Sequence, residues 1–132
     1  MKKEKQKSVK TLKRILWERY FSPYIRQRDN GKCFTCGDKK DWKKQHAGHF
    51  IPKGSYSDTE FDETNVHCQC PKCNTFKHGN LVEYTLKMID KYGREKVNEL
   101  RQRRNKVKRW KSGELEDLIS YYKSKIDEMS KL

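Results

Sequence analysis

Two Cys-x-x-Cys pairs, Cys33/Cys36 and Cys70/Cys73, enclose the histidine and asparagine residues that are best placed to do chemistry in this chain. Zinc prefers four soft ligands in a tetrahedron, and each Cys-x-x-Cys turn presents two thiolates together. Four thiolates leave no open position on the ion, so we predict a structural zinc rather than a catalytic one. The alternatives are buried unligated cysteines or a redox dithiol, which needs only one such pair.

The fifth cysteine, Cys68, lies two residues before Cys70, and we expect it to be a semi-buried free thiol. No stretch is long and apolar enough to span a bilayer, and no apolar signal core follows the charged N-terminus. We therefore expect a cytoplasmic protein with no membrane partner. Thiols stay reduced in that compartment, which favours metal ligation over disulfides.

Composition points to a polyanionic partner. The 132 residues suit one compact domain, with 33% hydrophobic and 38% charged residues. Lysine and arginine number 32 against 18 acidic residues, giving a net charge of +14. Nucleic acid is the commonest polyanion for so basic a chain, and the alternative is a generic solvated surface.

His49, Asn65 and Asn74 are candidates for hydrolysis of a phosphodiester, which needs a base and positive charge at the phosphorus. Neutral His49 could take a proton from water, although a lone histidine is usually structural. The Asn65 amide could bridge a hairpin loop and orient the imidazole, or Asn65 could simply be a turn residue. The Asn74 amide oxygen could face a hard cation such as magnesium.

These residues together resemble the HNH endonucleases, also called ββα-metal nucleases, and in particular the phage NinG/Rap recombination family. The similarity extends over roughly residues 24 to 128. Its segments are Tyr24-Ile25-Arg26-Gln27-Arg28-Asp29, Cys33-x-x-Cys36-Gly37, Ala47-Gly48-His49-Phe50-Ile51-Pro52, Phe61-Asp62-Glu63-Thr64-Asn65-Val66-His67, Gln69-Cys70, Cys73-Asn74, Lys77, Gly79-Asn80-Leu81-Val82, Tyr84 and Trp110.

The resemblance implies an α+β, mostly helical fold, in which helices flank an HNH core that contains the four-cysteine zinc knuckle. It implies DNA cleavage with one Mg²⁺ or Mn²⁺ ion, with His49 as general base, Asn65 as positioning residue and Asn74 as metal ligand. Lys77 would stabilise the scissile phosphate. The implied substrate is branched DNA, such as Holliday junctions and D-loops.

The chain departs from the HNH pattern at Gly48, where many of these sites have a metal-binding side chain immediately before the base. His46 is the nearest candidate to replace that ligand, and the alternative is an exposed strand residue. His78, one helical turn after Asn74, is a further candidate, because related sites have a ligand there. His67 could contact phosphate, hydrogen-bond across the hairpin, or pack.

Three segments are expected within one compact domain: a basic arm with helices (1–28), the zinc-knuckle nuclease core (29–82) and basic C-terminal helices (83–132). Apolar spacing predicts a helix at 8–20, and Ser22-Pro23 predicts the start of another that ends near residue 28. Strands are expected at 47–51 and 64–68. A helix should start at Pro71 and stop at Gly79-Asn80. Further helices are expected from 81 to Gly93, at 95–108, and along the apolar stripe from Leu115 to Met129.

Basic residues on the 95–108 helix and just beyond it are the main candidates for DNA contact, because phosphate contacts carry little sequence information and suit recognition by shape. They are Arg101, Arg103, Arg104, Lys106, Lys108 and Arg109, and the alternative is a solvated face. Lys2, Lys3, Lys5, Lys7, Lys10, Lys13 and Arg14 form a second basic run. Tyr121 and Tyr122 could belong to a homodimer surface or to the core.

Three functions are compatible with the sequence. The leading one is a metal-dependent, structure-specific DNA endonuclease of phage recombination. The second is an HNH enzyme of restriction or homing type that cuts ordinary duplex DNA. The third is a zinc-stabilised DNA-binding protein without catalysis, which Gly48 at a ligand position keeps open.

Overall fold

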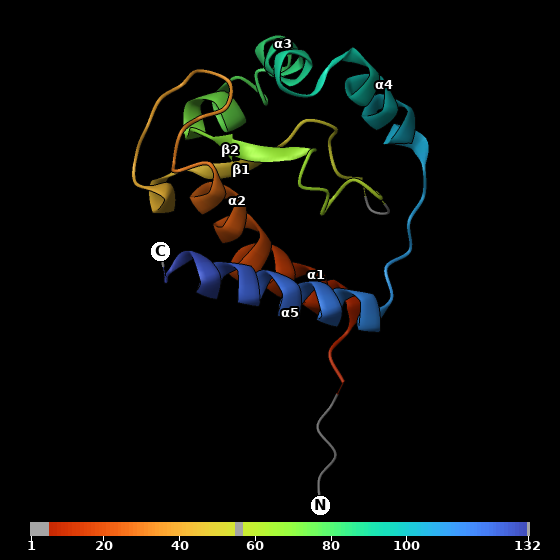
Figure 1. The fold of residues 1–132 in the computed structure, drawn as a ribbon. Helices are drawn as coiled ribbons and strands as arrows, with labels where there is room; N and C mark the ends of the chain where they lie inside the picture. Colours follow the sequence, from red (N-terminus) through yellow and green to blue (C-terminus); the bar gives the residue numbers. More distant parts are fainter. Residues whose placement is uncertain (1–5, 55–56, 132) are drawn as a thin grey trace, which may run out of the picture. The chain divides into compact units, whose positions relative to one another are not determined.

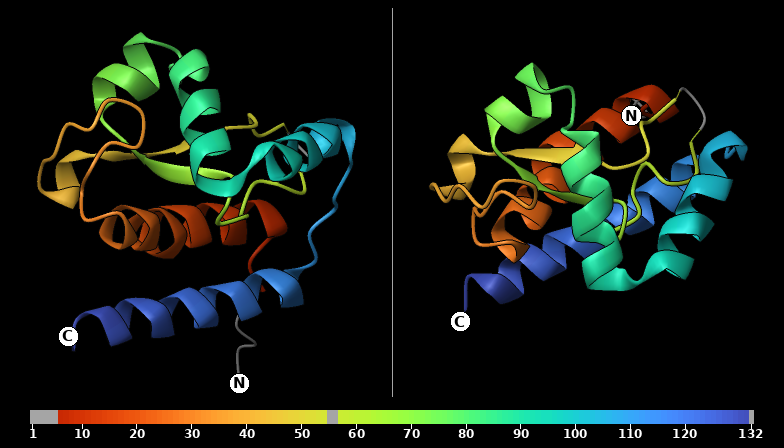
Figure 2. Two further views of the ribbon diagram at one scale, coloured as in Figure 1. Left: turned by 45° about the horizontal axis from the view of Figure 1, so that its top comes forward. Right: turned by 90° about the horizontal axis from the view of Figure 1, so that it is seen from above.

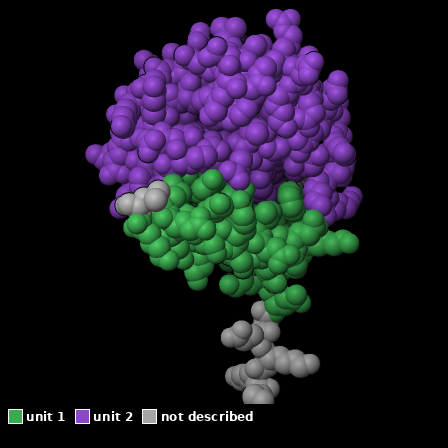
Figure 3. Space-filling view, in the orientation of Figure 1, with its two compact units in different colours: residues 1–24, 110–132 green, residues 25–109 purple. Residues whose placement is uncertain are grey.

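The computed structural model describes residues 6–54 and 57–131, which form a mixed α+β fold with one two-stranded sheet among them. The chain divides into two compact units, residues 1–24 with 110–132 and residues 25–109 (Figure 3). Lys2, Lys3 and Lys5 of the predicted basic arm lie outside the described residues. Along the described chain, every helix is too short or too polar to cross a bilayer.

The first unit pairs the N-terminal helices with the C-terminal helix (Figure 1). Helix α1 spans Val9–Ile15, and Ser8 caps it by accepting a hydrogen bond from the Thr11 amide. Helix α5 spans Ser112–Met129, as its apolar stripe predicted. Tyr122 packs edge-on against Phe21, with ring centroids 5.0 Å apart, and is buried. Tyr122 therefore belongs to the core, whereas Tyr121 is exposed.

The second helix predicted from Ser22-Pro23 to about residue 28 is confirmed, but no helix boundary precedes Pro23, so the predicted N-cap at Ser22 was wrong. A π-helical segment, η1 (Leu16–Phe21), continues α1 directly into α2 (Ser22–Arg28). The Ser22 amide bonds to the Trp17 carbonyl, five residues back, and Ser22 is helical instead of an extended N-cap. A proline inside a helix removes one backbone hydrogen bond and clashes with the preceding turn. The wider π turn just before Pro23 is a recognised way of accommodating such an irregularity.

The second unit is built around a short antiparallel hairpin (Figures 1 and 2). Strand β1 (His46–His49) pairs with β2 (Val66–Gln69), and the register places His46 opposite Gln69 and Gly48 opposite His67. Both strands lie within two residues of their predicted positions. A 3₁₀ turn, η2 (Trp42–Lys44), precedes β1, and a π-helical segment, η3 (Lys72–Phe76), follows β2.

Helices α3 (Leu81–Tyr92) and α4 (Arg94–Gln102) pack against one another and contribute to an apolar cluster in the core of this unit. That cluster consists of Phe50, Ile51, Tyr84, Met88, Val97 and Leu100. The helix predicted from Pro71 to Gly79-Asn80 is shorter than expected, because η3 ends at Phe76. The chain does turn at Gly79 and Asn80 before α3, and both have positive φ angles, 91° and 51°. The predicted C-cap is confirmed, since the Gly93 amide bonds to the Ile89 carbonyl.

Helix α4 ends six residues earlier than the predicted helix at 95–108. A 3₁₀ turn, η4 (Arg103–Asn105), follows it, and Lys106 is already extended. The buried face of α4 consists of Val97 and Leu100. The next positions on that face are Arg104 and Val107, both exposed, so nothing apolar is gained by continuing the helix. Val107 instead forms an isolated antiparallel bridge with Ser57.

Candidate functional site

The four cysteines of the two Cys-x-x-Cys pairs meet in the second unit and are positioned to bind a metal ion. Their sulfur atoms all lie within 4.8 Å of one another, and the Sγ atoms of Cys36 and Cys70 are 3.6 Å apart. Four thiolates around a tetrahedral zinc, with Zn–S near 2.3 Å, would be separated by about 3.8 Å. The donor set and its dimensions therefore fit zinc. The predicted separation of Cys68 is confirmed, since this buried thiol lies outside the cluster.

The ionisation of these thiols also favours a cation. Burial raises the pKa of Cys33, but hydrogen bonds from Thr35 and from the backbone outweigh burial and lower it to about 6. Burial and the neighbouring thiols raise the pKa of Cys36 to about 12. One negative charge is thus readily held, whereas further thiolates at so short a distance repel each other. A divalent ion removes this obstacle, because coordinated thiols are deprotonated outright.

Hydrogen bonds tie the cysteine cluster to the elements on either side of it. The Phe34 amide donates to the Cys68 carbonyl at 2.8 Å, so the first cysteine turn is attached to β2. Thr35 Oγ1 lies 3.3 Å from Cys33 Sγ and 3.2 Å from Gln69 Nε2. The Asn80 side-chain amide points to Cys73 Sγ at 3.6 Å. The cluster therefore connects β2, η3 and the start of α3.

His49 is the last residue of β1, and a backbone carbonyl selects its tautomer. Its Nε2 atom lies 2.9 Å from the Glu60 carbonyl oxygen. Because a carbonyl only accepts, Nε2 bears the proton in this bond and Nδ1 bears the lone pair. Burial lowers the pKa of His49, and Lys53 lowers it further, against opposing effects of Glu60. The imidazole is therefore neutral near pH 7.

Asn65 bridges the ends of the loop between the two strands, as predicted. Its Oδ1 accepts from the Ile51 amide at 2.8 Å, and its Nδ2 donates to the carbonyls of Ile51 and Thr59, both at 3.1 Å. The predicted contact between the Asn65 amide and the His49 imidazole is absent from this set. Asn65 Oδ1 and Nδ2 instead bond to backbone groups of the loop. Asn65 therefore acts on His49 through the loop that contains Glu60.

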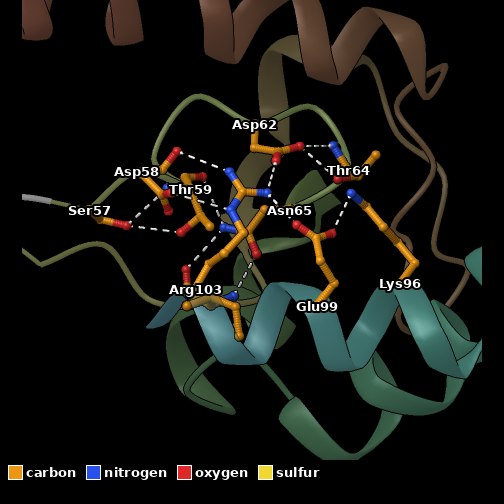
Figure 4. A network of polar contacts seen from close by, with 10 residues as sticks. Ser57, Asp58, Thr59, Asp62, Thr64, Asn65, Lys96, Glu99 and Arg103 are labelled. Atoms are coloured by element: carbon orange, nitrogen blue, oxygen red, sulfur yellow. Dashed lines mark hydrogen bonds and ion pairs between the residues drawn. The ribbon is translucent and has the colours of Figure 1, made fainter. Parts of the chain in front are cut away.

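Arg103 closes the same loop from α4's end (Figure 4). Its guanidinium bonds to Asp62 at 2.9 Å, Glu99 at 3.1 Å and Asp58 at 3.3 Å. Burial raises the pKa of Asp62, but hydrogen bonds from Thr64 and Arg103 outweigh burial and lower it. With so many carboxylate partners, Arg103 has few donors left for a phosphate.

The other basic candidates do not share one helix, as the helix predicted at 95–108 would require. Arg101 is on α4, Arg104 is on η4, and Lys106, Lys108 and Arg109 follow in the connection to α5. Arg101 and Arg104 line a hollow of about 370 Å³ together with Asn98, Gln102 and Asn105. Phosphate binding by these residues stays a prediction.

The helical relation expected between Asn74 and His78 does not exist. Segment η3 ends at Phe76, and His78 has a left-handed backbone with φ of 49°. His78 and Lys77 are both exposed, whereas Asn74 is half-buried. The sequence argument for His78 as a ligand one helical turn after Asn74 was therefore wrong.

His46 and Asn74 lie together, because Asn74 Nδ2 is 3.0 Å from His46 Nδ1. Two amide oxygens lie over Gly48: a Cβ at position 48 would overlap Gln69 Oε1 and lie 2.9 Å from Asn74 Oδ1. Two amide oxygens and an imidazole thus gather where the HNH pattern has a ligand side chain. Hard cations such as Mg²⁺ and Mn²⁺ prefer oxygen donors of this kind, so these residues fit such an ion.

His67, whose role the sequence left open, is fully buried and forms a hydrogen-bond chain with two tyrosines. Tyr84 donates its hydroxyl proton to the Gly48 carbonyl at 2.7 Å, so its oxygen accepts from His67 Nδ1 at 3.0 Å. His67 Nε2 then accepts from the Tyr92 hydroxyl at 2.8 Å. Burial, helped by Arg28, lowers the pKa of His67 to about 3. This neutral chain fixes the backbone of β1 just before His49.

Sequence reasoning missed Gln69, Glu60 and the tyrosine pair. Glu60 contributes a backbone carbonyl, which no residue type reveals. Tyr84 and Tyr92 lie in the helix expected from 81 to Gly93, and their spacing gave no sign of the hydroxyl partners. Gln69 had one usable signal, since an amide on a strand directly before a metal-binding cysteine is a polar residue at a position that is usually buried.

The fold and the site together define a small α+β protein with a four-cysteine cluster positioned to bind metal. The chain belongs to the NinG family: the model described as "Bacteriophage Lambda NinG protein" matches residues 1–131. It is similar to Protein ninG of Escherichia phage 933W (34% identity) and of Escherichia phage lambda (33%), each over 80% of this chain and 52% of the relative. Protein ninG of Enterobacteria phage H19B is 37% identical over 66% of this chain and 43% of the relative. The chain thus spans about half the length of these relatives, and no solved structure matches it.

Removal of the metal should unfold the second unit. Structural zinc contributes on the order of 10 kcal/mol in small zinc domains, which is comparable to the whole stability of a typical domain. Cys73→Ser should therefore lose zinc and the cooperative thermal transition, measured by metal analysis and circular dichroism. Cys68→Ala is the matched control, because Cys68 is buried but lies outside the cluster, and it should retain one zinc per chain. Zinc-free protein with an unchanged melting curve would contradict the assignment.

The protein should become less stable as the pH falls, because His67 is buried in its neutral form. Its pKa is about 3 in the folded state, below the ordinary value of 6.5, so only the unfolded state binds the proton between these pH values. The contribution is complete above pH 6.5 and is lost as the pH falls toward 3. Between pH 7.5 and 5.5 the wild type should lose about 1.4 kcal/mol more than His67→Gln in urea unfolding. Equal losses in the two proteins would contradict the buried neutral imidazole.

Substitution of Arg103 should lower the free energy of unfolding much more than the same substitution of Arg104. Arg103→Gln leaves the carboxylates of Asp58 and Asp62 without their cation, and we expect a loss of about 1–3 kcal/mol. Arg104→Gln changes an exposed side chain and should alter the free energy of unfolding by less than about 0.5 kcal/mol. Urea denaturation of both variants measures the difference. A similar small effect in both would mean that the ion-pair network contributes little.

Proposed function

We propose that this chain is a metal-dependent DNA endonuclease of the HNH (ββα-metal) type that acts on branched DNA. The observation that best supports the proposal is the state of His49. It is a neutral imidazole with Nδ1 as the proton acceptor, at the end of a strand whose hairpin partner leads directly into the helix that bears Asn74. Two strands followed by a helix, with a base on the first strand, is the order that an HNH site requires.

The protein's own groups supply the proton transfer and its geometry. His49 Nδ1 accepts a proton from the attacking water, while the Glu60 carbonyl holds the opposite nitrogen. A base of this kind typically contributes ~10²–10⁴-fold to a rate. Asn65 and Arg103 keep the loop of Glu60 in place, and the His67 chain holds the carbonyl of Gly48. Each of these contacts limits how far the imidazole can move.

A divalent ion near Asn74 would supply the positive charge that stabilises the phosphorane and the departing oxygen. Asn74 is the residue that would hold it, with His46 beside its amide. Lys77 is exposed on the turn after η3, and a flexible ammonium there is available to a phosphate oxygen. A structural zinc at the four cysteines completes the proposal.

Branched DNA as the substrate rests on charge and on the family. The net charge of +14 and the exposed basic residues between Arg101 and Arg109 suit contacts to the phosphate backbone. Backbone contacts distinguish shapes better than sequences. The relatives are phage proteins named ninG, and for NinG/Rap-like proteins a role in recombination makes joint molecules the natural substrate class.

Cleavage of a labelled four-way junction and of a linear duplex with matched sequence tests the proposal. Wild type with Mg²⁺ or Mn²⁺ should cut the junction in preference to the duplex, and His49→Ala should reduce the rate by ~10²–10⁴-fold. The variant must keep its zinc and its melting temperature, so that the loss reflects chemistry and not folding. A gel-shift assay should find junction binding retained.

Two other outcomes would replace the proposal. Equal cutting of junction and duplex would indicate an HNH enzyme for ordinary duplex DNA. Junction binding by the wild type without cleavage in either metal would indicate a zinc-stabilised DNA-binding protein.

A further inference from the structure

The side chain of Gln69 is fully buried, and its orientation is fixed by its amino group. Gln69 Nε2 donates to the Gly79 carbonyl at 2.9 Å and to Thr35 Oγ1 at 3.2 Å. Because a carbonyl can only accept, the amide cannot be turned over, and Oε1 must face the other way. Among the residues that the structure describes, Oε1 has no hydrogen-bond partner.

A buried amide oxygen without a partner is costly, on the order of 1–3 kcal/mol, and native proteins keep few of them. Such an atom is commonly explained by a ligand, an ion or a strained functional site. The direction in which Gln69 Oε1 faces therefore becomes informative.

Gln69 Oε1 faces the Cα atom of Gly48. A side chain at position 48 would collide with it, and Asn74 Oδ1 would lie 2.9 Å from the same Cβ position. The Asn74 amide is oriented as well, because its Nδ2 is directed to His46 Nδ1 at 3.0 Å. Two amide oxygens from different elements, β2 and η3, thus converge on the point from which an HNH ligand at position 48 would project.

We propose that the amide oxygen of Gln69 is a ligand of the divalent cation, in place of the side chain that is missing at position 48. The inference rests on the proposed nuclease function, and it identifies a residue of the same site. Glycine at 48 is then a requirement of the arrangement, since only a residue without Cβ leaves room for the Gln69 oxygen. The cation in turn supplies the partner that this oxygen lacks.

The site is also connected to the cysteine cluster. Thr35 Oγ1 contacts Cys33 Sγ and receives the Gln69 amino group, and Gly79 lies in the turn that leads to Asn80, whose amide points to Cys73 Sγ. The cysteine cluster therefore orients Gln69 through Thr35 and through the turn at Gly79. Such outer partners are known to affect metal affinity by ~10–100-fold.

Mn²⁺ binding to zinc-loaded protein, measured without DNA by titration with electron paramagnetic resonance detection, tests the inference independently of cleavage. Wild type should bind one Mn²⁺ per chain, and Gln69→Ala should weaken binding by at least about tenfold. Gly48→Asp/Gln69→Ala should recover affinity, because the smaller residue at 69 makes room for a carboxylate at 48. Wild-type affinity in Gln69→Ala would overturn the inference.

Gln45→Ala is the matched control. Gln45 is a second buried glutamine whose Nε2 also bonds to loop carbonyls, those of Gly31 and Asp38, and whose Oε1 likewise lacks a partner among the described residues. Gln45 lies outside the group of Gln69, Asn74 and His46 that is proposed to face the cation. Gln45→Ala should therefore lower stability, and should leave the affinity for Mn²⁺ within about twofold of the wild type.

A measurement on the wild type decides the question if Gln69→Ala does not fold. Electron–nuclear double resonance of bound Mn²⁺, in protein labelled with ¹³C at the glutamine amide carbon, should give a coupling of the size expected for a directly coordinated amide. The absence of that coupling would overturn the inference. Junction cleavage by the same wild-type sample separates the two proposals. Cleavage without the coupling would contradict only the role of Gln69 as a ligand. The coupling without cleavage would contradict only the proposed nuclease function.

Discussion

The meeting of four thiols in one place is the constraint on which the second unit depends. Cys36 and Cys70 are 34 residues apart in sequence and 3.6 Å apart at their sulfur atoms. The strand that enters the second pair is β2, and the helical segment that contains its last cysteine is η3. Closing the cluster therefore sets the junction between strand and helix, and with it the positions of Gln69 and Asn74. In a unit with a modest apolar core, a metal site of this kind supplies stability that packing alone does not.

Around the cluster, the unit relies on polar contacts from loops as well as on apolar packing. The loop between β1 and β2 buries Phe50, Ile51 and Phe61, and its shape also comes from the Asn65 amide, from Asp62 with Thr64, and from Arg103. The buried tyrosine–histidine chain has the same effect on the other side of β1. The defined partners in these networks specify one arrangement and fix His49 Nε2 against a backbone oxygen.

Much of this could be predicted from local pattern. Cys-x-x-Cys spacing placed the cluster, Gly79-Asn80 marked a break in the chain before α3, and periodic apolar residues located α3 and α5. The errors arose where tertiary contacts outweigh local signals. Pro23 indicated a helix start, but a π turn accommodates it. The basic stretch after Leu100 had helical propensity and no buried face to use.

The site was predicted only in outline for the same reason. Histidine and asparagine types at given spacing suggested a base and a loop clamp, yet the atom that orients His49 belongs to the backbone of Glu60. Arg103 was grouped with its basic neighbours because its acidic partners lie 41 and 45 residues earlier. The position of the Gln69 side chain depends on Gly48, which lies on the opposite strand and leaves room for it. Contacts of this range depend on the register of the hairpin, which the sequence alone leaves open by a residue or two.

The close approach of Gln69 to Gly48 has a consequence for how sequences of this fold can diverge. The two positions are diagonal neighbours across one antiparallel ladder, and they compete for a single volume. A long amide at one position excludes any side chain at the other, so neither can drift alone. Related chains should divide into two groups, one with glycine at 48 and glutamine at 69, the other with a side chain at 48 and a small residue at 69. The pair would then mark a branch point in the history of the family.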